Sequence, residues 1–279
     1  MKNALSFDVE DYFQVSNFES FIRFEDWEKH ESRVERNTRI ILDVLAENKI
    51  RATFFTLGWV AEKVPKLVRA IADAGHELAA HGYRHRLVYS LDPQEFRRDL
   101  RQSIDLIEQA GGQKIIGHRA PSFSITEKSL WALDIMQEEG VRYDSSVFPV
   151  RHPRYGIPDA PRAPYEIRPG FWEFPMATFT VGATKIPVAG GAYFRLYPYP
   201  VTRWGLRRIN REGKPLVMYL HPWEFDPQQP RFDVSLNVRL RHYSNLDKTE
   251  RRLRRLCQDF QFTTVRDVLG LPEPSPALR

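Results

Sequence analysis

The sequence predicts an α/β protein in which parallel strands alternate with helices to form a βα barrel. Three observations support this fold class. Apolar strand patterns alternate with amphipathic helical patterns at least four times in the first half of the chain. Each predicted strand is followed by a polar cluster, as at the carboxyl rim of such barrels. A chain of 279 residues with 42% hydrophobic and 13% aromatic residues is able to bury a large core.

The early elements follow from local patterns of capping residues, β-branched residues and apolar stripes. In order, we expect a buried strand at 4–7, a loop or short helix over 12–31, a helix that begins at the capping box Ser32-x-x-Glu35, a strand at 52–56, a helix at about 60–74 closed by Gly75, and a short strand at 77–80.

The middle of the chain contains the clearest helix signal. Asp92 as the N-cap, Pro93 at the first helical position and Glu95 as the capping carboxylate predict a helix that ends at Gly111-Gly112. We then expect a strand at 114–117, a helix at 126–139 and a strand at 141–143.

Residues 149–200 interrupt this alternation, because they are rich in proline, tyrosine and arginine. Short strand-like pieces occur at 171–175 and 184–188, and the aromatic content favours an ordered cleft wall formed by long rim loops. Afterwards we expect a helix at 201–211, a strand at 216–220, a helix at about 247–259, a strand at 262–265 and a closing helix. We find no repeat or linker, and we therefore expect one domain over residues 1–279.

Composition excludes several classes of protein. The net charge is +5, but no basic tract with interleaved aromatic residues is present, so nucleic acid is not an expected partner. Cys257 is the only cysteine, which excludes an internal disulfide. No signal peptide and no apolar run long enough to span a bilayer are found, so we expect a cytoplasmic protein without an integral membrane segment.

Two polar clusters have the composition of a metal site. His81 and His85 lie four residues apart and are able to converge on one ion if the backbone makes about one helical turn. Asp8 and Glu10 point to the same face of a strand, because side chains alternate along it. One carboxylate that binds a metal and a second that accepts a proton are the requirements of metal-assisted hydrolysis. Taken alone, either cluster could equally be solvated or structural.

Further clusters complete a set of motifs, in chain order Ser6-Phe7-Asp8-Val9-Glu10-Asp11, His81-Gly82-Tyr83-Arg84-His85, Arg119-Ala120-Pro121-Ser122, Tyr143-Asp144-Ser145-Ser146 and Leu220-His221. This set resembles the NodB-type polysaccharide deacetylases, carbohydrate esterase family 4, over roughly residues 3–225. The resemblance implies a distorted (β/α)7 barrel and removal of N-linked acetyl groups from a glycan.

The chain most resembles the subgroup linked to exosortase and exopolysaccharide loci. The segments that carry this likeness are Phe7-Asp8-Val9-Glu10-Asp11-Tyr12-Phe13, Gly190-Gly191-Ala192-Tyr193-Phe194-Arg195, His221-Pro222-Trp223-Glu224-Phe225 and the tail at His242-Tyr243-Ser244-Asn245-Leu246. The resemblance implies a subgroup-specific C-terminal extension from about residue 226.

The expected ligands of the metal are Glu10, His81 and His85. The family motif has adjacent aspartates, whereas Val9 separates the carboxylates here. The carboxylate ligand is therefore Glu10, favoured by strand alternation, or Asp11. The expected ion is Zn²⁺, with Co²⁺ or Ni²⁺ as alternatives, and it would lower the pKa of a bound water to roughly 7.

The remaining roles also follow the resemblance. Asp8 is the expected base, and Arg119 would pair with it and keep it ionised. The backbone N–H of Ser122 would stabilise the oxyanion. His221 would protonate the departing amine, with Asp144 as the candidate carboxylate beside it.

Four residues are candidates for binding the sugar, by stacking or by hydrogen bonds: Tyr193, Arg195, Trp172 and Trp223. The expected partner is an N-acetylated glycan, and a cytoplasmic enzyme would act on a nucleotide- or lipid-linked precursor. Two alternatives stay open: hydrolysis of a small non-sugar amide on the same scaffold, and a non-catalytic glycan-binding protein. The sugar, the linkage, the chain length and the oligomeric state do not follow from the sequence.

Overall fold

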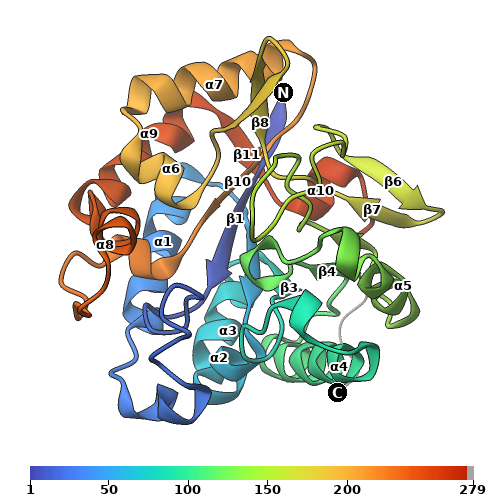
Figure 1. The fold of residues 1–279 in the computed structure, drawn as a ribbon, viewed down its shortest axis with the longest axis vertical. Coiled ribbons are helices and arrows are strands. Elements are labelled where there is room, and N and C mark those ends of the chain that lie inside the picture. Colours follow the sequence, from blue (N-terminus) through green and yellow to red (C-terminus); the bar gives the residue numbers. More distant parts are fainter. Residues whose placement is uncertain (275–279) are drawn as a thin grey trace.

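The structure, a computed structural model that describes residues 1–274, is an α/β fold built on one curled half-barrel sheet (Figure 1). The strands of this sheet are β1 (Lys2–Val9), β2 (Thr53–Thr56), β3 (Glu77–Ala80), β4 (Gly117–His118), β5 (Tyr143–Asp144), β6 (Tyr165–Arg168), β7 (Phe171–Glu173), β10 (Val217–Leu220) and β11 (Gln261–Thr263). They lie in the order β10-β1-β2-β3-β4-β5-β7-β6, and β11 pairs with β1. All pairings from β10 to β7 are parallel. The predicted fold class, a distorted (β/α)7 barrel, is confirmed.

Helices wrap the sheet, and those from residues 191–259 gather on one side of it, in orange and red at the upper left of Figure 1. Within the described residues, no helix has the length and apolarity needed to cross a bilayer. The helices are α1 (Val34–Asn48), α2 (Gly58–Lys63), α3 (Pro65–Asp73), α4 (Pro93–Gly111), α5 (Trp131–Glu138), α6 (Gly191–Leu196), α7 (Tyr199–Arg211), α8 (Leu236–Tyr243), α9 (Thr249–Asp259) and α10 (Val265–Leu269).

Short 3-10 turns and one hairpin complete the fold. The hairpin, β8 (Thr178–Val181) with β9 (Thr184–Pro187), forms a separate two-stranded sheet. The 3-10 turns are η1 (Phe24–Lys29), η2 (Val88–Ser90), η3 (Pro121–Phe123), η4 (Glu127–Ser129), η5 (Pro222–Phe225) and η6 (Leu246–Lys248).

The start of α4 confirms the predicted caps. The Asp92 carboxylate accepts hydrogen bonds from the backbone N–H groups of Gln94 and Glu95, both at 2.8 Å. The Glu95 side chain in turn accepts from the Asp92 N–H at 3.1 Å. Gly112 ends the helix with φ 73°, a left-handed conformation that glycine adopts without strain.

The start of α1 does not use the predicted capping box at Ser32 and Glu35. Its acceptor is Asp11, just after β1, whose Oδ2 accepts from the N–H groups of Arg33 at 2.7 Å and Val34 at 3.0 Å. Ser32 donates its own hydroxyl to the same oxygen at 2.9 Å. The prediction was wrong because this cap comes from a residue that is distant in sequence, and local spacing cannot reveal it.

Other boundaries differ where the backbone breaks a long pattern. The helix expected over 60–74 is divided into α2 and α3 at Val64, because Pro65 disfavours helical geometry in the residue before it. The strand expected at 114–117 is reduced to β4, and the helices expected at 126–139 and 247–259 each begin as a 3-10 turn.

Strand β1 pairs with three other strands, β2, β10 and β11. It pairs with β10 through Ala4–Phe7 and with β2 through Ser6–Val9, and all its residues after Lys2 are buried. Residues at its carboxyl end therefore lie at the rim, beside those of its neighbouring strands. The carboxyl ends of β3, β4 and β10 deliver His81, Arg119 and His221 to the same rim. The sheet thus gathers the sequence motifs at one place, as the alternation of strands and helices predicted.

Candidate metal centre and active site

Glu10, His81 and His85 form a cluster that could hold a metal ion. One ligand atom from each lies within 4.8 Å of the other two, and all three side chains are buried. The Oε2 atom of Glu10 lies 2.9 Å from Nε2 of His85. Two imidazoles and one carboxylate are the donor set of many catalytic zinc sites. The structure thus brings together the three ligands expected from the sequence.

The two histidines converge through a loop rather than through the helical turn assumed from their spacing. Gly82 and His85 both adopt left-handed backbone angles, with φ 73° and 55°. A Cβ atom at residue 82 would lie 3.1 Å from a carboxylate oxygen of Asp99, which also accepts the Tyr83 N–H at 2.9 Å. Histidine rarely has a positive φ, and such strain concentrates at functional sites.

The protonation state of His81 and the surroundings of Glu10 fit a bound metal ion. Nδ1 of His81 lies 2.8 Å from the carbonyl oxygen of Arg119, to which it donates as the neutral tautomer, leaving the Nε2 lone pair free. Burial and the neighbouring His85 hold the pKa of His81 well below its usual range, so the ring is neutral. Glu10 Oε2 is buried and accepts no well-aligned hydrogen bond from residues 1–274. These features are expected where side chains bind a metal cation.

Asp11, the alternative carboxylate, is occupied elsewhere. Its Oδ2 caps α1, and its Oδ1 accepts the Tyr12 N–H at 3.0 Å. Burial raises its pKa to about 6 despite these hydrogen bonds. The geometry thus groups Glu10, and not Asp11, with the two histidines.

Asp8 lies beside the cluster and is held by Arg119. Nη1 of Arg119 donates to Oδ1 of Asp8 at 2.6 Å, and both side chains are buried. The guanidinium is itself fixed, because it donates to the Ser6 hydroxyl at 2.9 Å and to the carbonyl of Ser145 at 3.0 Å, and it lies 4.0 Å over the ring of Phe55. The expected pair of Asp8 and Arg119 is therefore present. Arg119 binds Oδ1 of Asp8 and does not bind Oδ2.

His221 lies beside both Asp8 and Glu10. Its Nε2 is 3.8 Å from Asp8 Oδ2 and 3.7 Å from Glu10 Oε1. Its Nδ1 lies 2.7 Å from Oε1 of Glu224, whose other oxygen accepts from Nε of Arg195 at 2.5 Å. Burial lowers the pKa of His221, but the Glu224 hydrogen bond and the nearby carboxylates outweigh it and raise the pKa to about 9. The partner of His221 is Glu224.

Asp144, which we expected beside His221, is instead part of a separate buried network. Its Oδ1 lies 2.9 Å from Nδ1 of His118 and accepts the Ser146 hydroxyl at 2.7 Å. Burial and the charge of Asp144 raise the pKa of the adjacent Glu173 well above its usual range. The expectation for Asp144 is corrected, because His118 on the neighbouring strand takes its carboxylate. The i, i+3 spacing of His221 and Glu224 was the sequence signal that could have identified the correct partner.

Ser122, the expected oxyanion donor, lies in a strained turn at the cavity. Ser122 and Phe123 both have positive φ, 51° and 56°, in the short turn η3. Both line the same cavity as Asp8, Glu10 and the histidines. The Ser122 hydroxyl lies 2.7 Å from that of Ser16. Two consecutive non-glycine residues in this conformation are energetically costly, and strain of this kind is concentrated at functional sites.

The four residues expected to bind sugar differ in position. Arg195 is buried and bonded to Glu224 and to three backbone carbonyls, so it is not available to a ligand. Trp223 lines the cavity, but it donates Nε1–H to Glu10 at 3.1 Å and stacks on the ring of His221. Tyr193 and Trp172 are partly buried and do not line the cavity.

Sequence reasoning missed the residues that form the walls of this cavity, which is about 210 Å³ in volume. They come from the loop after β1, the turn η3 after β4, the segment after β5, strand β10 and helix α8, and no local pattern links them. These wall residues are Val15, Ser16, Asn17, Phe123, His152, Arg154, Tyr155, Tyr219 and Arg241.

Two families match successive parts of the chain. Residues 19–143 match the polysaccharide deacetylase family, and residues 145–270 match a domain of unknown function, DUF3473. A peptidoglycan-N-acetylglucosamine deacetylase from Bacillus cereus is 30% identical over 117 residues, which is 38% of this chain and 42% of that protein. A chitooligosaccharide deacetylase from Rhizobium leguminosarum is 33% identical over 96 residues, 34% of this chain and 42% of that protein. The chain thus spans less than half the length of these curated relatives.

Solved structures share the fold over nearly the whole chain. A putative polysaccharide deacetylase from Mycobacterium smegmatis superposes with a TM-score of 0.64 at 18% identity, covering 100% of this chain and 94% of that one. A CE4 family pseudoenzyme from Bacillus anthracis gives a TM-score of 0.52 at 16% identity, covering 96% of this chain and 65% of that one. At such identities the likeness concerns the fold alone. The likeness to the polysaccharide deacetylase family in sequence thus covers residues 19–143, and the likeness in fold covers nearly the whole chain.

Proposed function

We propose that this chain is a metal-dependent hydrolase that removes N-acetyl groups from an amino-sugar-containing polysaccharide or its precursor. One observation carries this proposal. A single cavity contains the Glu10, His81 and His85 cluster together with Asp8 and His221. A ligand set, a candidate base and a candidate acid at one place are what amide hydrolysis needs.

Glu10, His81 and His85 would hold the ion, for which Zn²⁺ is our first candidate and Co²⁺ or Ni²⁺ the alternatives. When bound, a divalent ion supplies Lewis-acid polarisation of the acetyl carbonyl and lowers the pKa of water. Trp223 orients one ligand, because its Nε1–H donates to Glu10 Oε1 at 3.1 Å.

Asp8 is the proposed base. Arg119 neutralises one of its oxygens and fixes the carboxylate, so that the other oxygen is able to take the proton of the attacking water. In the cavity Ser122 lies near the cluster, and we assign its backbone N–H to the developing oxyanion. The positive φ of Ser122 supports this assignment, because strain of this kind is retained where a backbone group must point in a special direction.

His221 is the proposed acid. An amine leaves poorly unless it is protonated, and the raised pKa of His221 supplies an imidazolium at neutral pH. Glu224 accepts the Nδ1 proton, so the Nε2 proton points toward the cavity that contains Asp8 and Glu10. Glu224 takes the role that we expected of Asp144, and Arg195 fixes Glu224 from behind.

We also infer that the two matched segments form one catalytic domain of the subgroup linked to exopolysaccharide loci. Asp8 lies on β1 and Glu10 directly follows it, both ahead of the first match; His81 and His85 lie within that match, and His221 lies in the second. Strand β10 of the second segment pairs with β1 and Trp223 donates to Glu10, while Arg119 of the first segment donates to the carbonyl oxygen of Ser145 in the second.

The test is acetate release from N-acetylglucosamine oligomers by the purified chain, first freed of metal and then supplied with Zn²⁺, Co²⁺ or Ni²⁺. We expect release only with metal. Asp8→Ala should abolish release and still bind one ion per chain, whereas His85→Ala should lose the ion, measured by elemental analysis. Metal binding without release from any oligomer would contradict the glycan as substrate, and absence of metal binding would contradict the site.

A further inference from the structure

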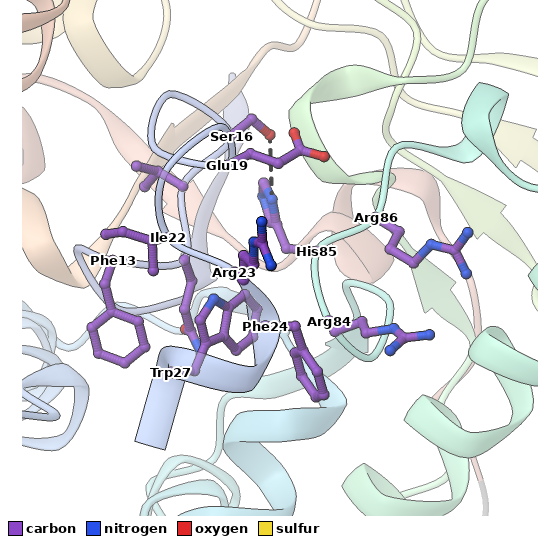
Figure 2. A pocket seen from close by; sticks show the side chains of 12 residues that line it. Phe13, Ser16, Glu19, Ile22, Arg23, Phe24, Trp27, Arg84, His85 and Arg86 are labelled. Carbon is purple, nitrogen blue, oxygen red and sulfur yellow. Dashed lines mark hydrogen bonds between the residues drawn. The ribbon is translucent and has the colours of Figure 1, made fainter. Parts of the chain in front are cut away.

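Two further hollows border the metal cavity and share lining residues with it. One hollow, of about 290 Å³, shares Val15, Ser16 and His85 with the cavity (Figure 2). A second hollow, of about 500 Å³, shares His152, Arg154 and Tyr155 with it. A bound chain is therefore able to extend past the cluster in two directions. The units on either side of an N-acetylated sugar would lie in or near these hollows.

The hollow beside His85 is positively charged. Arg23, Arg84 and Arg86 line it, against the single carboxylate of Glu19. Figure 2 shows Arg23 next to His85 and Arg84 beside Phe24, with the Arg84 guanidinium 5.1 Å from the centre of the Phe24 ring. Arg86 lies 3.4 Å from the carboxylate of Glu95. Neither Arg23 nor Arg84 has a carboxylate within 4.0 Å among residues 1–274. Two guanidinium groups here are thus without an ionic partner.

The opposite wall of the cavity carries the same charge. Arg154 and Arg241 line it, and in the described part of the chain neither forms an ion pair. Besides burial, the charges of Arg241 and Arg154 lower the pKa of His152, which places both guanidinium groups close to that ring. Farther out, cations and carboxylates are mixed, because Lys128 and Arg151 lie with Glu127 and Asp159. The excess of positive charge is therefore nearest the metal cluster.

These arginines differ from those that maintain the fold. Arg119 and Arg195 are buried and bonded to carboxylates and backbone carbonyls. Arg23, Arg154 and Arg241 are exposed at the edge of the cleft and have no such bonds from their guanidinium groups within residues 1–274. A free guanidinium forms paired hydrogen bonds with a carboxylate or a phosphate, and a neutral sugar offers no group of this kind.

We propose that the glycan bound here carries anionic groups, carboxylate or phosphate, on the units that flank the N-acetylated sugar, with Arg23 and Arg84 on one side and Arg154 and Arg241 on the other as their binding residues. This proposal rests on the proposed deacetylase function and names its class of substrate. A glycan with repeated uronic acids would contact both sides, whereas a nucleotide or lipid pyrophosphate would contact one. The position of the cations on both sides favours the first source.

The test compares three substrates with the metal-loaded enzyme: oligosaccharides in which N-acetylglucosamine alternates with glucuronic acid, neutral N-acetylglucosamine oligomers of the same length, and UDP-N-acetylglucosamine. We expect kcat/KM to be about tenfold higher for the acidic oligosaccharide than for the neutral one. About 0.5 M salt should reduce this preference, because exposed charges are screened. Equal values for the acidic and neutral oligomers, with no preference for UDP-N-acetylglucosamine, would overturn the proposal.

Arginine variants test which side chains cause the preference for the acidic oligosaccharide. Arg23→Gln and Arg154→Gln should each lower the ratio of kcat/KM for the acidic over the neutral oligomer by about fivefold, mainly through KM. Arg98→Gln is the matched control, because Arg98 is exposed on α4 and lines neither the metal cavity nor its two neighbouring hollows. If a variant lowers kcat/KM by the same factor for both oligomers, this would contradict the assignment of its arginine to the anionic groups. A preference for UDP-N-acetylglucosamine that only one of the two variants reduces would identify phosphate as the anionic group.

A binding measurement separates this proposal from the proposed function. If no substrate releases acetate, calorimetry with the same metal-loaded protein still compares the unreacted oligomers. Tighter binding of the acidic oligomer, weakened by Arg154→Gln, would support the anionic site while the deacetylase function failed. Equal affinity for acidic and neutral oligomers would refute the anionic site itself.

Discussion

Replacement of Glu224 by glutamine is the most informative change at the proposed acid. Glu224 is buried, and its two oxygens separately contact His221 at 2.7 Å and Arg195 at 2.5 Å. Glutamine keeps the volume and an oxygen acceptor but removes the negative charge. Arg195 retains the carbonyls of Arg241, His242 and Ser244 as acceptors, so the local fold should persist.

The expected magnitude follows from the lost charge. A hydrogen bond to a charged group contributes about 1.5–3 kcal/mol and a neutral one about 0.5–1.5 kcal/mol, so loss of the charge on Glu224 should remove about 1–1.5 kcal/mol of stabilisation from the imidazolium that donates the proton. At about 1.4 kcal/mol for each factor of ten, kcat for the acetamido sugar should fall about 5- to 12-fold. Metal content should be unchanged, because Glu224 is outside the Glu10, His81 and His85 cluster.

The assay uses two substrates that differ in their leaving group. An amine must be protonated to leave, whereas the phenolate of a 4-nitrophenyl ester leaves without a proton. Glu224→Gln should therefore reduce deacetylation of the sugar amide strongly and hydrolysis of 4-nitrophenyl acetate by no more than about threefold. A loss of structure at the site would reduce both rates together.

The matched control is Asp144→Asn, which removes a buried carboxylate that contacts His118 instead of His221. Asp144→Asn should lower the rates of amide hydrolysis and of ester hydrolysis by the same factor. If Glu224→Gln slows the two substrates equally, or if Asp144→Asn alone slows the amide selectively, then Glu224 is not the partner of the acid.

The remaining predictions concern stability and its dependence on pH. Asp11→Ala removes the acceptor of the Arg33 and Val34 N–H groups and should lower the free energy of unfolding by about 2–3 kcal/mol in urea titrations, while the exposed control Asp26→Ala should change it by less than about 0.5 kcal/mol. Unchanged stability of Asp11→Ala would exclude the proposed cap. Burial lowers the pKa of His76 from 6.5 to about 4, and its Nδ1 accepts the Ala52 N–H at 3.2 Å, so the neutral ring favours the folded state. Its contribution is therefore present above pH 6.5 and is lost as the pH falls toward 4, by about 2 kcal/mol at about pH 5. His76→Phe should remove this part of the slope of stability against pH, and a slope equal to that of the unsubstituted chain would contradict it.

The sequence by itself determined the features that depend on neighbouring residues. The caps of α4 at Asp92 and Glu95 were predicted correctly, because both partners lie within one turn of the chain. The order of strands and polar clusters predicted the rim, because parallel strands in a barrel end on the same side. The grouping of Glu10 with His81 and His85 followed from strand alternation and motif spacing, although their convergence uses a loop with two positive φ angles.

Only the tertiary structure decided which carboxylate serves which partner. Asp11, Asp144 and Glu224 are equivalent as residue types, but Asp11 caps α1, Asp144 binds His118, and Glu224 binds His221. The arginines divide in the same way: Arg195 is buried against Glu224, while Arg154 and Arg241 remain exposed at the cleft. The reason is physical. Local propensity and spacing act over one turn or one strand, whereas the partner of a buried charge depends on which side chains the barrel brings within hydrogen-bonding distance from positions far apart in the chain.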